Sequence, residues 1–162
     1  GDEPYPRFQT LASDFFREWD GFLAFLREEE INDPAMNQCE LTYVNHIGIV
    51  PGEQAFADLP NIFPSMGARV DGDGLPVPEL VNWTIRYPLL DGQGRLYVEM
   101  QPAFRQPDMR FVLTLTLTAR GAPNIRSREG IFGWFGMAHE HALRAFDRLT
   151  GPKMHELWGK KE

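Results

Sequence analysis

The segment from residue 81 to residue 120 most constrains the fold, because polar and apolar residues alternate along three successive stretches separated by short turns. A period of two predicts strands over residues 81–89, 95–104 and 110–120. Asp91-Gly-Gln-Gly and Gln106-Pro-Asp connect them, and both are too short for a crossover. The three strands must therefore form an antiparallel meander.

The register of this meander follows from its last strand, residues 110–120. Its apolar positions are Phe111, Leu113, Leu115 and Leu117, and they alternate with Val112, Thr114, Thr116 and Thr118. We expect the leucines to be buried and the threonines to be more exposed. A fourth strand is predicted over residues 39–47, where the alternation has the same period.

Two amphipathic helices flank the strands, over residues 8–31 and 128–148, with apolar residues recurring at spacings of three and four. In the first helix, Phe16, Leu23 and Phe25 widen the apolar stripe beyond what a surface helix needs. This width indicates burial on more than one side or contact with another element. In the second helix, we interpret Gly130, Gly133 and Gly136 as a close-packing strip, unless regular helix begins only after Gly136.

These elements predict an α+β fold: a four-stranded antiparallel sheet with one apolar face packed against the N- and C-terminal helices. A length of 162 residues suits one domain. The composition, 43% hydrophobic and 12% aromatic, is that of a folded globular chain. No apolar run reaches the roughly 18 residues of a membrane span, and no secretion signal is visible, so we expect a cytoplasmic protein without membrane contact.

Charge is unevenly distributed along the chain. Residues 1–40 hold ten acidic and three basic residues, a sum of −7, whereas residues 41–162 hold thirteen of each. An acidic chain does not favour nucleic-acid binding, where phosphate neutralisation supplies most of the affinity. The exception is residues 105–128, with five arginines against one aspartate.

Catalytic and metal-binding signatures are not found in the sequence. His139 and His141 are two residues apart on a helix, about 200° around its axis, so they cannot share a metal on one face. Cys39 has no motif around it and suits a buried apolar position. We therefore predict no catalytic residues, no metal and no cofactor, and lean against an enzyme.

The strand Cys39-Glu-Leu-Thr-Tyr-Val-Asn-His-Ile and the ending from Ala138-His-Glu-His to Met154-His-Glu-Leu-Trp-Gly are distinctive. They resemble a sporadically distributed family of bacterial proteins of unknown function. In that family this region is the C-terminal part of a longer protein. The resemblance implies that residues 1–162 are a single domain of that kind, and it supplies no mechanism.

The polar face of the sheet is one candidate site. His46, Arg86 and Glu99 point away from the apolar face together with a set of threonines. Antiparallel sheets often have one solvated face, so this face is either solvated or a docking surface. Arg86 and Glu99 could also be a cross-strand pair.

The second candidate site is an arginine cluster before the last helix, comprising Arg120, Arg126 and Arg128. Ser127 is a credible N-cap, so an anion could bind the free amides and the guanidinium groups. The alternative is that these arginines only aid solubility.

The function that these observations favour is a non-catalytic binding or protein-interaction module. Its partner would be the chain's own missing N-terminal region, another protomer in a dimer, or a different protein. The alternative is an enzyme or enzyme part that acts on a phosphorylated or nucleic-acid substrate through the arginine cluster.

Overall fold

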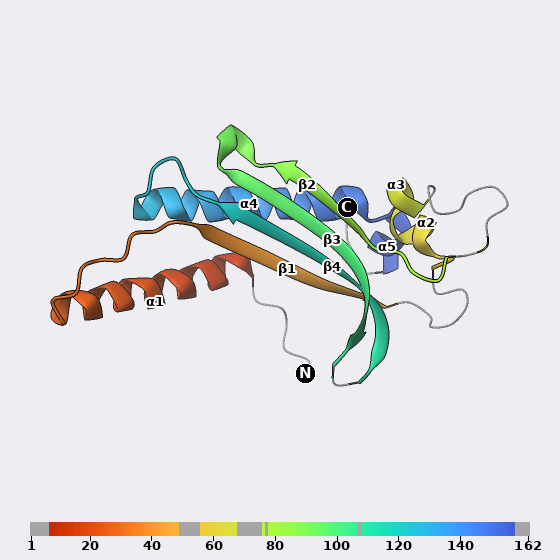
Figure 1. Cartoon of the computed structure of the whole chain (residues 1–162), viewed down its shortest axis with the longest axis horizontal. Coiled ribbons are helices and arrows are strands. Elements are labelled where there is room, and N and C mark those ends of the chain that lie inside the picture. The colour runs from red at the N-terminus through yellow and green to blue at the C-terminus, as the bar shows by residue number, and fades with distance from the viewer. Residues whose placement is uncertain (1–6, 49–55, 68–75, 77, 107, 158–162) are drawn as a thin grey trace.

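The structure is a computed structural model that describes residues 7–48, 56–67, 76, 78–106 and 108–157 (Figure 1). Its elements are α1 (Phe8–Glu28), β1 (Cys39–Gly48), α2 (Leu59–Ile62), α3 (Pro64–Gly67), β2 (Trp83–Pro88), the 3-10 turn η1 (Leu90–Gly92), β3 (Gly94–Arg105), β4 (Arg110–Gly121), α4 (Arg128–Leu149) and α5 (Pro152–Leu157). The four strands and the two long helices lie where the periodicity predicts them. The predicted α+β class is confirmed.

The four strands form one antiparallel sheet in the order β1-β4-β3-β2. Strands β2, β3 and β4 are the predicted meander, and β1 joins the sheet beside β4. The β2–β3 turn uses positive φ angles at Asp91, Gly92 and Gly94. A Cβ at Gly121 would lie 1.9 Å from the carbonyl oxygen of Gln93, so glycine is required where β4 passes this turn.

One face of the sheet is covered by α4. Leu113, Leu115 and Leu117 are at most 1% exposed, whereas on the opposite face Thr116 is partly exposed and Thr114 is 8% exposed, still buried but less completely than the leucines. The predicted register of β4 is therefore confirmed. On the helix side, Trp134 is almost fully buried, and its indole N–H donates to the carbonyl oxygen of Gln93 at 3.0 Å.

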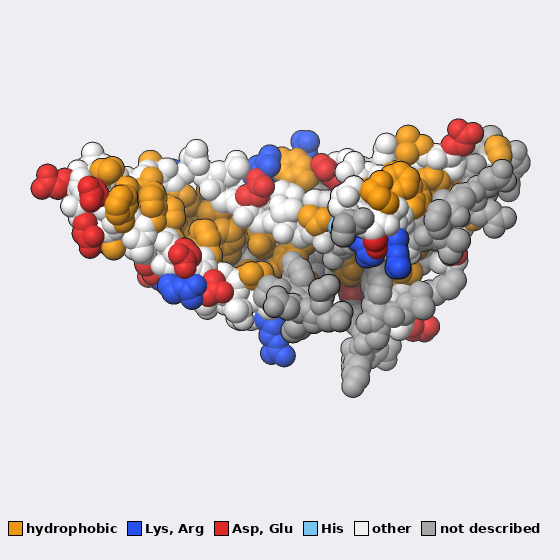
Figure 2. Space-filling model, turned by 90° about the horizontal axis from the view of Figure 1, so that it is seen from below, with side chains coloured by type: hydrophobic (Ala, Val, Ile, Leu, Met, Phe, Trp, Pro, Cys, Tyr) orange, Lys and Arg blue, Asp and Glu red, His pale blue; other side chains and the backbone are white. Residues whose placement is uncertain are grey.

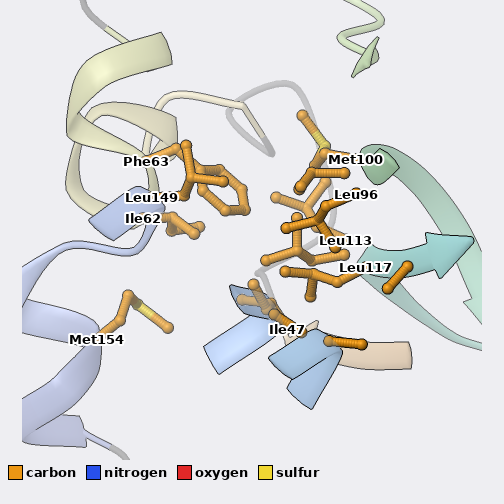
Figure 3. Packing of buried hydrophobic residues seen from close by; sticks show 14 of the residues in the cluster. Ile47, Ile62, Phe63, Leu96, Met100, Leu113, Leu117, Leu149 and Met154 are labelled. Carbon is orange, nitrogen blue, oxygen red and sulfur yellow. The ribbon is translucent and has the colours of Figure 1, made fainter. Parts of the chain in front are cut away.

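The far end of the covered face is closed by the short helices. Figure 3 shows residues from α2, α4 and α5 facing residues from the strands across this part of the core. Phe63 is fully buried and meets Trp83 edge-on, with ring centroids 5.4 Å apart. Part of the long connection between β1 and β2 is thus packed into the chain's own core.

Helix α1 packs on α4 beside the sheet (Figure 1). The ring contacts Phe16–Phe132, Phe15–Phe135 and Phe8–His139 show that the two helices run in opposite directions. The buried residues of α1 do not belong to the main core cluster. Within the described part of the chain, neither long helix is apolar enough to cross a membrane.

Candidate functional site

The open sheet face carries the three residues of the predicted interaction face. His46 on β1, Glu99 on β3 and Arg86 on β2 are all exposed on this face. Because β1 and β2 are the two edge strands of the sheet, His46 and Arg86 share this face but lie at opposite edges of it. Arg86 is opposite Tyr97, whereas Glu99 is opposite Thr84. Among the described residues, no ion pair joins Arg86 to Glu99.

A different cluster forms at one corner of this face, around Tyr97. The guanidinium carbon of Arg86 lies 4.9 Å from the centre of the Tyr97 ring, and that of Arg120 lies 6.0 Å from it. Arg95 is directly opposite Arg120 in the β3–β4 ladder. Glu40 accepts a hydrogen bond from Arg120 at 2.7 Å, which raises the pKa of that guanidinium. We call Arg86, Arg95, Tyr97 and Arg120 the open-face arginine cluster.

The structure places the other two arginines of the predicted anion site elsewhere, beside α1. The guanidinium of Arg126 donates to the carbonyl oxygen of Met36 at 3.2 Å. Arg128 donates twice to the Asp20 carboxylate, at 3.1 and 2.8 Å, and lies over the ring of Phe16. These hydrogen bonds lower the pKa of Asp20. Arg126 and Arg128 line one pocket together with Asp20 and Met36, whereas Arg120 belongs to the open sheet face.

The predicted helix cap at the start of α4 is present. The Ser127 hydroxyl oxygen accepts a hydrogen bond from the amide of Gly130 at 3.1 Å. Gly130 is tightly packed, since a Cβ there would lie 2.0 Å from the carbonyl oxygen of Ile125. Gly133 and Gly136 have nothing within 4 Å of the same position. Among the described residues, the predicted close packing is therefore found at Gly130 and not at Gly133 or Gly136.

The histidines of α4 have local partners. The Nδ1 atom of His139 lies 2.7 Å from the Tyr43 hydroxyl, and its ring stacks on Phe8 at 4.2 Å. Burial lowers the pKa of His139, because it disfavours the charged imidazolium. His141 bonds the carbonyl oxygen of Met137 through Nδ1. Within the described part of the chain, no three His, Cys, Asp or Glu side chains come together as a metal site would require.

Exposed apolar residues, three of them phenylalanines, line one side of α1. Leu11, Phe15, Phe22 and Phe25 are 41%, 45%, 46% and 52% exposed, and we call them the α1 strip. Figure 2 shows a band of hydrophobic side chains along the part of the molecule that α1 forms. The rings of Phe15, Trp19 and Phe22 are in consecutive contact, at 6.4 and 6.0 Å. The strip is therefore an ordered aromatic surface.

Comparison of the chain with known protein families, with curated proteins and with solved structures finds no match. The resemblance to a bacterial family stays a prediction, and it assigns no residue to a site. The candidate sites rest on geometry alone.

Sequence reasoning missed Arg95 and Tyr97 in the arginine cluster. Their grouping with Arg120 depends on the β3–β4 register, in which Arg95 faces Arg120 and Tyr97 faces Thr118. The available signal was the tight turn at Asp91–Gly94, which sets the β2–β3 register and so places Arg86 opposite Tyr97.

Proposed function

We propose that this chain is a non-catalytic protein-interaction module that binds its partner through the α1 strip. The observation that carries the proposal is the exposure of four large apolar side chains along one side of α1. About half of each side chain is exposed, so the strip presents roughly 350 Å² of apolar surface, at about 200 Å² per aromatic residue. Contiguous apolar patches of this size commonly mark interaction sites.

The size of the strip suits the centre of an ordinary interface. A standard interface buries about 800 Å² on each partner, and the apolar part is concentrated at its core. Aromatic side chains supply most of the binding energy in such cores. The three phenylalanines of the strip are therefore the residues expected to anchor the partner.

The test is the affinity of the chain for a synthetic amphipathic helical peptide with a leucine-rich face, followed by tryptophan fluorescence. Trp19 lies between the rings of Phe15 and Phe22 and reports on this surface. We expect Phe22→Ser/Phe25→Ser to weaken binding about tenfold or more, because anchoring aromatic residues each contribute more than about 1 kcal/mol.

The matched control is Val44→Ser/Ile125→Ser, which removes two apolar side chains outside α1 that are at least as exposed as Phe22 and Phe25. This control should bind like the wild type. No binding by the wild type, or equal loss in both double variants, would contradict the proposal.

A second candidate function rests on the open-face arginine cluster, and it is the binding of a phosphate-bearing ligand. Three arginines and Glu40 give this corner a formal charge of +3 − 1 = +2, which matches a phosphate monoester at neutral pH. Like charges directly opposite in a ladder are destabilising, and a bound anion would relieve the pair Arg95–Arg120. Guanidinium groups bind phosphate bidentately.

Titration with phenyl phosphate at low salt tests this candidate. Arg86→Ala/Arg95→Ala should weaken binding about tenfold or more, because charge-assisted hydrogen bonds are lost. Arg126→Ala, which removes an exposed arginine outside the cluster, is the control. Loss of binding in Arg126→Ala alone would indicate that the anion binds near the start of α4 and not at the open-face arginine cluster.

A further inference from the structure

The α1 strip has the spacing of a helix–helix seam. Leu11, Phe15, Phe22 and Phe25, together with Glu18, follow one another at intervals of four, three, four and three residues. This interval pattern keeps one line of side chains facing a partner helix, as the a and d positions do in a coiled coil. A partner that binds as a flat surface or as an extended strand would not require this spacing.

A second line of apolar residues on α1 is buried, in contrast to the α1 strip. It comprises Ala12, Phe16 and Leu26. Phe16 contacts α4 through Phe132, with ring centroids 5.6 Å apart. The strip is the other apolar line on the same helix. Helix α4 reaches it at Phe15, whose ring meets Phe135 at 5.4 Å, and about half of each of the four side chains of the strip is still exposed.

Glu18 lies at the centre of the strip, seven residues from both Leu11 and Phe25. Its side chain is 77% exposed, and one of its oxygens, Oε1, accepts hydrogen bonds from Arg17 at 3.1 and 3.2 Å. A single polar residue in an apolar seam specifies the register and the identity of the partner, at a cost in stability. The pair with Arg17 is exposed and uses only Oε1, so inside a seam that excludes water the carboxylate would also require a cation on the facing helix.

The central position of Glu18 argues against a second copy of this chain as the occupant. If two α1 helices paired in full along the strip, parallel or antiparallel, Glu18 would face its own counterpart. Two carboxylates would then share one seam, and like charges brought together in an interface disfavour the pairing. The α1 segment is also acidic, with seven acidic and three basic residues between 7 and 33.

We propose that the partner of the α1 strip is an α-helix of another protein, with an apolar seam and a lysine or arginine at the position facing Glu18. This proposal rests on the proposed interaction function and specifies its partner. Electrostatic complementarity of this kind selects the partner more than it adds affinity.

The first experiment uses two synthetic 21-residue helical peptides with identical leucine seams, one with lysine and one with glutamate at the central seam position. The lysine peptide should bind the wild-type chain at least about tenfold more tightly than the glutamate peptide at low salt. Glu18→Lys should reverse the preference. Because Glu18 is central, either orientation of the peptide brings the two charges together.

The second experiment measures self-association by analytical ultracentrifugation. Glu18→Leu completes the apolar seam, so this variant should dimerise at concentrations at which the wild type is monomeric. Adding Phe22→Ser should abolish the dimer. The control is Glu140→Leu on α4, which replaces another exposed glutamate that is paired with an arginine, and it should remain monomeric.

The outcomes separate this inference from the proposed function. Equal binding of both peptides, lost in Phe22→Ser/Phe25→Ser, would overturn the role of Glu18 and leave the interaction surface standing. A wild-type dimer that Phe22→Ser disrupts would make a second copy the occupant and overturn the inference. Failure of both peptides to bind would contradict the interaction surface itself.

Discussion

Helices α1 and α4 are almost equal in length, with 21 and 22 residues, and both are amphipathic, yet they are buried in different ways. The buried residues Trp134, Ala138, Ala142 and Leu149 of α4 belong to the main core. The buried residues of α1 lie outside that core, and α1 has a second apolar line that is exposed. Helix α4 thus contributes to the main core, whereas α1 lies outside it and presents the exposed α1 strip.

This difference predicts two levels of stability. A helix whose apolar contacts reach the sheet should unfold with the whole chain, whereas a helix attached through another helix can open locally. The four predictions below test this division.

The largest effect is expected at Trp134, the largest fully buried side chain among the described residues. Trp134→Ala should destabilise the whole chain by about 4–5 kcal/mol, because it leaves a cavity and removes one of the two N–H donors to the Gln93 carbonyl oxygen, the other being the amide of Ala122. Phe22→Ala in the α1 strip should cost about 0.5 kcal/mol or less, since Phe22 is already half exposed. Urea denaturation measures both, and similar costs would contradict the division between the helices.

The next effect is local and concerns Phe16, which is buried between α1 and α4. Phe16→Ala should weaken the attachment of α1 by about 3 kcal/mol, the lower end for a buried phenylalanine. Hydrogen exchange should become faster in residues 8–28, while protection in β3 and β4 is unchanged. Equal loss of protection in the strands would mean that α1 and the sheet unfold as one unit.

The third effect compares two glycines near the start of α4. Gly133→Ala should stabilise the chain by about 1 kcal/mol, because alanine favours helix and a Cβ there meets nothing within 4 Å. Gly130→Ala should destabilise it, since its Cβ would lie 2.0 Å from the carbonyl oxygen of Ile125. Thermal unfolding distinguishes the signs, and stabilisation by both substitutions would contradict the packing at Gly130.

Sequence periodicity predicted the sheet more completely than it predicted the sites. The alternation in residues 110–120 determines which side of β4 is buried, because a shift of one residue would expose Leu113 and Leu115. The excess apolar width of α1 was also visible in the sequence. The sequence did not show that the line of Ala12, Phe16 and Leu26 is buried whereas the α1 strip is about half exposed, because this depends on how the two helices meet.

The open-face arginine cluster shows the same limit. Arg120 is 25 residues or more from Arg86 and Arg95 in the chain, and the proximity of the three arises from two ladders of the sheet. Arg126 and Arg128, close to Arg120 in sequence, instead contact Met36 and Asp20. Sequence neighbourhood was a poor guide here, because Arg120 still belongs to a strand whereas Arg126 and Arg128 follow its end.

The smallest effect is a pH dependence at the contact between α1 and α4. His139 stacks on Phe8 of α1 and bonds the Tyr43 hydroxyl. Burial lowers the pKa of His139 below its ordinary value of 6.5, so the folded chain binds this proton less readily than the unfolded chain does. Stability from this group is therefore present above pH 6.5 and decreases as the pH falls through that value.

His139→Gln should remove this contribution, because glutamine does not titrate. Urea denaturation at pH 7.5 and at pH 5.5 should show a smaller loss of stability on acidification in this variant than in the wild type. His46→Gln, on the open sheet face, is the control and should behave like the wild type. If the wild type and His139→Gln lost the same stability between the two pH values, the buried imidazole would not be the group that couples α1 attachment to pH.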